Sequence, residues 1–301
     1  MAINTSSFAK ALWPGVNAWY GKEYSEYPVE YKDLFDTHSS KRAWEEDVGV
    51  SSFGLAVVKP EGSSIQYDTE RQAFTTRYTP VVFALGFTIT REVVDDDQYD
   101  IVGQRKAQGL AFSMRQTKEV VAANVYNRAF NTSYLGGDGK AMLVSDHPNL
   151  AGGSQSNILA TAADLSEAAL EQACIDIAGF TNDRGLLIAV RPKTLVIPRQ
   201  LMFEAKRILG TDGRVATADN DLNALKTLGV IPQVVTNHYL TDTDAWFIRT
   251  DAKHGLKYFE RRADEFGMDN DFDTENAKYK ATSRYAFGWT DWRGIYGTPG
   301  A

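Results

Sequence analysis

The pattern of apolar positions predicts one very long helix. Residues 98–130 contain no proline, and Leu110, Met114, Val121 and Val125 recur at spacings that place them on one face of a helix. Three consecutive aspartates precede this stretch and a glycine pair follows it, which are signals for the start and the end of a helix. At about 1.5 Å per residue the helix would be roughly 48 Å long, well beyond three or four turns.

A long strand near the end of the chain matches this helix. From Ala277 to Trp289 apolar or small residues occupy the odd positions, and mainly charged or polar residues occupy the even ones. At about 3.3 Å per residue the strand would reach roughly 43 Å. We therefore expect the helix to lie across the apolar face of a long β-ribbon, which gives an elongated plate that compact enzymes seldom need.

Residues 1–47 carry three of the six tryptophans and a cluster of tyrosines, interrupted by prolines and glycines. Because the periodicity is weak, we expect an extended arm whose aromatic anchors dock on another surface. An arm wrapped over its own domain is an equally good interpretation.

Residues 48–80 read as two strands around a Gly/Ser turn, followed by a core-like strand at 81–90. The hairpin has few large aliphatic side chains for its length, and an isolated hairpin is marginal in water. It therefore needs support, such as a neighbouring subunit, unless it is an ordinary edge hairpin. Our candidates for contacts between subunits come from this hairpin and the arm: Trp13, Trp19, Lys59, Glu61, Arg71 and Arg77.

The passage between the long helix and the final strand predicts a compact α/β unit. Its expected elements follow a glycine-rich stretch and are a helix starting at 164–166, strands at 186–190 and 194–197, a helix at 200–209 and a short helix at 219–228. Two further strands and an acidic bend at 264–275 complete the reading.

Composition narrows the function. The 301 residues are 43% apolar, enough for a real core, and the formal charge of −7 argues against a dedicated nucleic-acid binder. One cysteine, Cys174, excludes disulfides within the chain and cysteine-based metal sites. We expect neither a secretion signal nor a membrane span, and therefore a protein made and used in a reducing cytosol or in something assembled there.

Motifs for catalysis are weak. Phosphate-loop, GxGxxG, GxSxG and HExxH patterns do not occur, and the four histidines are widely separated in sequence. The best enzymatic candidate is Asp146-His147, where a carboxylate could tune an imidazole, but Pro148 and the surrounding glycines favour a turn. The acidic bend lacks the central glycine and final glutamate of an EF-hand, so a solvated loop is the better interpretation. We expect no catalytic residue, no cofactor and no metal.

An ordered set of sequence pieces resembles a known family. The pieces are SDHPN at 145–149 with Asn157, DLSEAALEQACIDIAG at 164–179, RPKTLVIPRQLMFEAKRIL at 191–209, NHYLTDTDAWFIRTD at 237–251, GLKYFERR at 255–262 and YKATSRYAFGWTDWRGIYG at 279–297. Together they resemble the major capsid proteins of tailed bacteriophages, with the Hong Kong 97-like shell fold, and in particular the Mu-like head-subunit branch. The resemblance covers most of residues 50–301.

The resemblance implies an α+β fold with four parts. These are an N-terminal arm at 1–47, an extended loop at 48–80 that lies over a neighbouring subunit, a peripheral domain at 81–139 and 246–291 with a spine helix at 98–130, and an axial domain at 140–245 and 292–301. Some relatives cross-link their subunits through a lysine of this loop. Lys59 lies in the right element, but no pattern identifies its acceptor, so we do not predict the cross-link.

The resemblance also implies a structural function. Many copies would self-assemble in the cytoplasm of the bacterial host into the hexamers and pentamers of an icosahedral head that encloses double-stranded DNA without reading its sequence. Implied partners are a portal protein and a separate scaffolding protein, because the residues before the hairpin are too few for a fused scaffold. The resemblance leaves open whether a decoration protein binds the shell, and it implies no contact with a membrane. An encapsulin-type protein compartment is the rival within this fold, and a hydrolytic enzyme using Asp146-His147 is the rival from another class.

Overall fold

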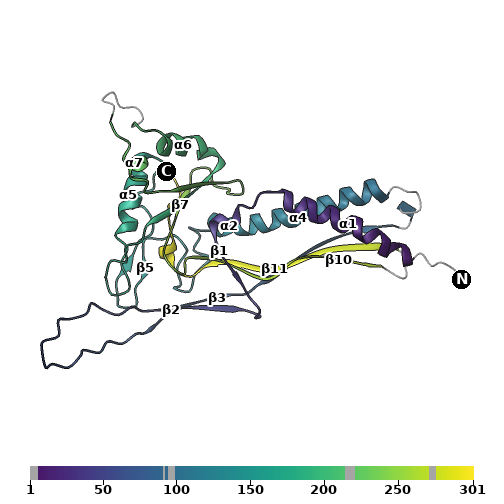
Figure 1. Ribbon diagram of the computed structural model, residues 1–301. Helices are drawn as coiled ribbons and strands as arrows, with labels where there is room; N and C mark the ends of the chain where they lie inside the picture. Colours follow the sequence, from purple (N-terminus) through teal and green to yellow (C-terminus); the bar gives the residue numbers. More distant parts are fainter. Residues whose placement is uncertain (1–5, 91, 94–98, 214–220, 271–275) are drawn as a thin grey trace.

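The computed structural model describes residues 6–90, 92–93, 99–213, 221–270 and 276–301. Figure 1 shows three parts: an elongated plate of helices and strands, a compact α/β unit at one end of it, and a hairpin that extends away from both. In the described residues no helix is both long and apolar enough to cross a membrane.

The plate is built on a sheet with the strand order β1-β10-β11-β4. Its strands are β1 (Asp36–Ser39), β10 (Leu256–Asn270), β11 (Ala277–Trp289) and β4 (Val81–Ile89). β1 pairs with β10 in parallel, and the other two pairings are antiparallel. Helix α4 (Tyr99–Asn127), 29 residues long, runs along this sheet (Figure 1).

The predicted match of long helix and long strand is confirmed. Leu110 and Met114 on α4 are buried in one cluster with Tyr279 and Ala281 of β11. β11 has the predicted bounds, and its buried residues all stand at odd positions, because one face of the strand meets the core. α4 ends three residues before the predicted Phe130, and residue 98 lies outside the described residues.

The predicted acidic bend is wrong over its first half. Residues 264–270 belong to β10, which continues to Asn270 opposite β11, while residues 271–275 lie outside the described residues. Phe266 and Met268 pack against the cluster under α4, so apolar side chains at alternate positions hold this acidic stretch in the sheet.

The N-terminal segment is helical, which corrects the predicted extended arm. Helix α1 (Ser6–Glu26) packs beside α4 and is followed by the short helix α2 (Tyr31–Leu34). Val16 and Tyr20 are buried in the cluster under α4, and the ring of Tyr20 stacks on Phe266 at 4.6 Å between centroids. Tyr20 thus packs within its own subunit, as the alternative interpretation had it.

A second sheet forms the core of the α/β unit. Its strands, in the order β12-β9-β7-β8, are β12 (Ile295–Thr298), β9 (Trp246–Thr250), β7 (Pro192–Pro198) and β8 (Gln233–Asn237). β7 and β8 are parallel, and the other pairings are antiparallel. β9 therefore pairs inside this unit, although residues 246–250 fall in the range expected for the peripheral domain.

Helices and short turns surround this second sheet. They are α5 (Glu167–Ala178), the 3-10 turn η1 (Arg199–Leu201), α6 (Met202–Gly210), α7 (Ala224–Leu228) and the 3-10 turn η2 (Trp292–Gly294). The predicted helix start is confirmed, because the Ser166 side chain accepts a hydrogen bond from the Ala169 amide and caps α5. The predicted strand at 186–190 is wrong: only an isolated bridge between Leu187 and Thr181 forms there.

Candidate functional site

Among the described residues, those of the hairpin are the least supported by their own subunit. β2 (Glu45–Val50) and β3 (Gln72–Tyr78) pair antiparallel at its base, and residues 51–71 continue beyond them without regular strand structure. Figure 1 shows this loop extending far from the body. The predicted hairpin is therefore confirmed in place, but its strands are confined to the base, and β2 begins three residues before the predicted start.

Large apolar side chains of this loop are exposed to solvent. Val58 is 92% exposed, Tyr67 is 90% exposed and Leu55 is 78% exposed. Phe53, Val57 and Ile65 are also more than half exposed. A loop that gathers so many exposed apolar side chains is typical of a surface that meets another molecule.

A largely buried ion pair holds the base of the hairpin on the plate. Asp47 of β2 contacts the ammonium of Lys257 on β10, and its Oδ1 lies 3.3 Å from Nδ1 of His254. Although burial alone would raise the pKa of Asp47, hydrogen bonds from Lys257 and Thr290 hold that pKa below its ordinary value. The hydroxyls of Tyr78 and Thr290 are 2.6 Å apart, so both strands of the base are tied to the same place.

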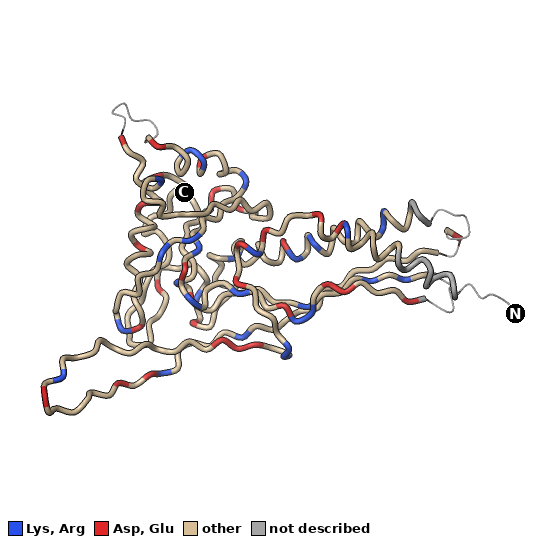
Figure 2. The backbone as a smooth tube through the Cα atoms, viewed as in Figure 1, with Lys and Arg blue, Asp and Glu red and all other residues tan. Residues whose placement is uncertain are grey.

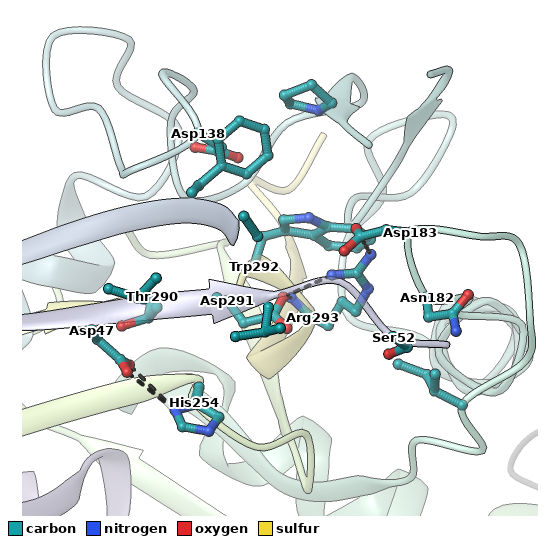
Figure 3. Close-up of a pocket in the computed structure, with 17 residues that line it drawn as sticks. Asp47, Ser52, Asp138, Asn182, Asp183, His254, Thr290, Asp291, Trp292 and Arg293 are labelled. Atoms are coloured by element: carbon teal, nitrogen blue, oxygen red, sulfur yellow. Dashed lines mark hydrogen bonds and ion pairs between the residues drawn. The ribbon is translucent and has the colours of Figure 1, made fainter. Parts of the chain in front are cut away.

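A cavity of about 350 Å³ separates the hairpin base from the α/β unit (Figure 3). Arg293 lies on its wall between two carboxylates, with one guanidinium nitrogen 3.3 Å from Asp183 and the other 3.3 Å from Asp291. The guanidinium of Arg293 thus balances one of these two carboxylate charges, and the group keeps a net negative charge. Within the described residues, no group of three histidine, cysteine or acidic side chains is placed to hold a metal ion.

His147 is a core residue, which corrects the candidate pair Asp146-His147. Its side chain is fully buried, with Nδ1 2.6 Å from Oδ2 of Asp138 and Nε2 3.2 Å from Oδ1 of Asn157. The ring stacks on Trp292 at 4.9 Å between centroids. Asp146 points elsewhere and pairs with Lys140 at the surface. A buried imidazole with both nitrogens engaged has no access to a substrate.

Asn157 is the centre of this junction. Its side-chain amide donates hydrogen bonds to the carbonyl oxygens of Met142, Trp292 and Ile295, at 2.8, 3.2 and 3.3 Å, and its Oδ1 accepts one from the Val144 amide at 3.0 Å. The strands β5 (His147–Pro148) and β6 (Ser154–Gln155) form a small hairpin beside it. The histidine and asparagine join the glycine-rich passage to the last residues of the chain, which is a structural role.

The predicted contact residues fall into two groups. Trp13 and Trp19 lie in α1, and Trp19 is partly buried against the cluster under α4. Lys59 and Glu61 are exposed near the tip of the hairpin.

The two arginines lie lower on the hairpin. Arg71 is exposed, and its backbone amide donates to Oγ of Ser51 at 2.8 Å. Arg77 forms an ion pair of 2.6 Å with Glu46, directly across the ladder, and covers the ring of Trp44.

The apolar side chains of the loop were missed as contact candidates. Phe53, Leu55 and Val57 alternate with small residues, and this alternation was a signal that could have found them. The polar composition of the hairpin as a whole masks this signal. Whether any of the six predicted residues contacts another subunit stays a prediction.

Comparison with known proteins decides the family. A family model described as phage capsid protein matches residues 72–298. The chain belongs to the phage capsid protein family. This capsid protein is therefore a structural subunit of a phage shell and not an enzyme, and its place is in the virion. A search of curated proteins found no match.

Solved structures share the fold of this capsid protein. The procapsid of bacteriophage JBD30 is 14% identical, with a TM-score of 0.54 over 98% of this chain and 76% of that one. The virus-like particle from Pyrococcus furiosus is 8% identical, with a TM-score of 0.53 over 93% of this chain and 96% of that one. The capsid of the native GTA particle is 12% identical, with a TM-score of 0.53 over 89% of each chain. The capsid protein thus has the Hong Kong 97-like α+β fold, with α4 as its spine helix.

Proposed function

We propose that this capsid protein is the major head subunit of a tailed phage, which assembles as hexamers and pentamers into an icosahedral shell around double-stranded DNA. The observation that carries the proposal is the hairpin, whose base is anchored while its loop exposes large apolar side chains. Burying one such side chain is worth about 2 kcal/mol. The loop therefore gains its stability only when another subunit covers it, and repeated contacts of this kind favour closed assemblies.

The charge distribution fits a container that does not read sequence. Figure 2 shows basic and acidic residues interspersed along the described chain, without a continuous basic stripe over it. A net charge of −7 adds a weak average repulsion of DNA. Non-specific contact with the packaged DNA is the relation that this surface supports.

The finer assignments rest on the resemblance of the sequence. The order of the pieces between residues 145 and 297 supports the Mu-like branch. The plate suits the peripheral domain, the α/β unit suits the axial domain around the five-fold and six-fold axes, and the hairpin suits the loop that lies over a neighbour. A separate scaffolding protein and a portal protein are the partners such a head needs during assembly. An encapsulin-type compartment shares the fold, but the phage family model favours the virion.

The role of the hairpin in contacts between subunits can be tested with a charge placed among the exposed apolar side chains of its loop. We expect Val58→Asp to keep the fold of the subunit, because the side chain is exposed, but to prevent shell formation, because the contact would bury a carboxylate. Ser64→Asp, in the same loop, adds the same charge at an exposed polar position and is the control. Electron microscopy and light scattering give the yield of shells. Shells of Val58→Asp at the yield of the control would contradict this use of the hairpin.

A further inference from the structure

The hairpin is held to its own subunit at two points of different character. The first is the pair of Asp47 and Lys257 at the base, in which the side chains are only 16% and 9% exposed. The second lies farther out, where Asp68 of the loop meets Arg184 of the α/β unit, with side chains 38% and 31% exposed. An ion pair open to solvent is more strongly screened and more easily exchanged for contacts with water than a largely buried one. The outer point is therefore the one that can open.

Asp68 joins the two arms of the loop and the body at a single carboxylate. Its Oδ2 accepts hydrogen bonds from the Gly54 amide at 2.8 Å and from a guanidinium nitrogen of Arg184 at 2.7 Å. Its Oδ1 accepts from the Thr69 amide at 2.8 Å, and Arg184 also donates to the Thr69 carbonyl at 2.8 Å. The hydrogen bonds from Gly54 and Thr69, with the charge of Arg184, lower the pKa of Asp68, so the carboxylate is ionised at neutral pH.

A structured turn presents Arg184 to the hairpin. Oδ1 of Asn182 accepts hydrogen bonds from the amides of Arg184 and Leu186, both at 2.9 Å. Gly185 has φ = +79°, a conformation that favours glycine. The side chain that holds the loop thus projects from a well-defined part of the α/β unit.

The hairpin has a natural pivot between its two anchors. The ladder of β2 and β3 shifts register between Val48 and Val50, and it stops at Val50 and Gln72. Beyond it, the Ser51 amide donates to the Arg71 carbonyl at 2.9 Å, and residues 52–70 have no regular strand structure. If the ion pair between Arg184 and Asp68 broke, the loop could rotate about this end of the ladder. The ion pair of Asp47 and Lys257 would keep the base in place.

We propose that Arg184 and Asp68 form a releasable latch that sets the direction of the hairpin in the unassembled subunit. The latch is an intramolecular device and stands without the shell. Its use rests on the proposed function: subunits of a closed shell meet their neighbours at more than one angle, and release of the latch lets one hairpin adopt more than one direction. Removing it is expected to leave the subunit folded and to raise the population of swung-out hairpins roughly fivefold, as suits one exposed ion pair.

Distances between two spin labels in the unassembled full chain test the latch. One label goes on Ser64→Cys in the loop and one on Lys206→Cys in α6, both exposed, with Cys174→Ser to remove the native thiol. We expect a single narrow distance distribution for this parent and a broad, shifted one for Arg184→Ala. Arg191→Ala removes an exposed arginine elsewhere in the same unit and is the matched control. Its distribution should equal that of the parent.

Two results would overturn the latch. One is a distribution for Arg184→Ala that equals the parent's, and the other is a parent whose distribution is already as broad as the variant's. Circular dichroism of each variant separates a swung hairpin from an unfolded subunit. Shells imaged by electron microscopy then test the use of the latch, since Arg184→Ala should give mixed diameters. If the parent forms no shells, the proposed function fails, while the distance measurement still decides the latch.

Discussion

Glu119 gives the sharpest test of how the N-terminal segment is tied to the spine helix. This glutamate of α4 is 1% exposed, and its two carboxylate oxygens accept hydrogen bonds from the backbone amides of Glu30 at 3.2 Å and Tyr31 at 2.9 Å. These amides lie at the start of α2, so Glu119 caps that helix from another part of the chain. Burial raises the pKa of Glu119 to about 7, although those hydrogen bonds and Arg115 oppose the shift.

The sign of the pH effect follows from this shift. The carboxyl binds its proton more tightly in the folded protein than in the unfolded chain, where its pKa is 4.5. Its contribution to stability is therefore fully present below pH 4.5 and is lost as the pH rises through about 7. Between pH 5 and pH 8 the loss amounts to about 2 to 3 kcal/mol in the free energy of unfolding.

Glu119→Gln isolates this contribution. The amide is similar in size and does not titrate, but it can accept from only one of the two backbone amides, so the variant is less stable by about 1 to 3 kcal/mol at pH 5. Urea unfolding of unassembled subunits at pH 5 and pH 8, followed by circular dichroism, gives the slope for each protein. The raised pKa of Asp264 and the lowered pKa of Asp47 affect both proteins equally. Equal slopes for the two proteins would refute the reasoning.

Further changes test the interior. His147→Ala should lower the free energy of unfolding by about 2 to 4 kcal/mol in a urea titration, because it removes one buried hydrogen-bond partner from the side chain of Asp138 and one from that of Asn157. An unchanged midpoint of the urea transition would contradict the structural role. Gly136→Ala should cost about 1 to 3 kcal/mol by the same assay, since its Cβ would lie 2.1 Å from the ring of Trp289. Gly109→Ala, exposed in α4 with open space around its Cβ, should instead raise Tm and stabilise by about 1 kcal/mol; a loss would contradict the described packing of α4.

Elements with a strong local period could be predicted from the sequence. The alternation in β11 and the apolar stripe of α4 each lie within one continuous stretch of sequence. The predicted bounds of both elements agree with the structure to within a few residues. The α/β unit was predicted in outline for the same reason, helped by a clear capping residue at Ser166.

Elements that depend on distant partners could not be predicted. Pro14, Gly15 and Gly21 all disfavour a helix interior, yet α1 includes them because Val16 and Tyr20 find a buried place beside α4. Packing against another element overrides local propensity in this case, and the sequence of the segment does not contain the partner.

The candidate site shows the same limit. Asp138, not the adjacent Asp146, is the partner of His147, because the chain folds back between them. Lys118 of α4 is only 4% exposed, with its ammonium near the rings of Tyr31, Tyr258 and Tyr285, and these partners lie far from it in the sequence. The sequence predicts that the hairpin needs support. Only the fold reveals that the apolar side chains of its loop are left exposed by the described part of the chain.

Assembly itself is the most direct test. The full-length chain would be expressed alone and with a candidate scaffolding protein, and the products imaged by negative-stain electron microscopy with light scattering in parallel. We expect closed shells, or large curved sheets and tubes where the scaffold is missing. A uniform small oligomer under every condition would contradict the claim that this chain builds a phage head.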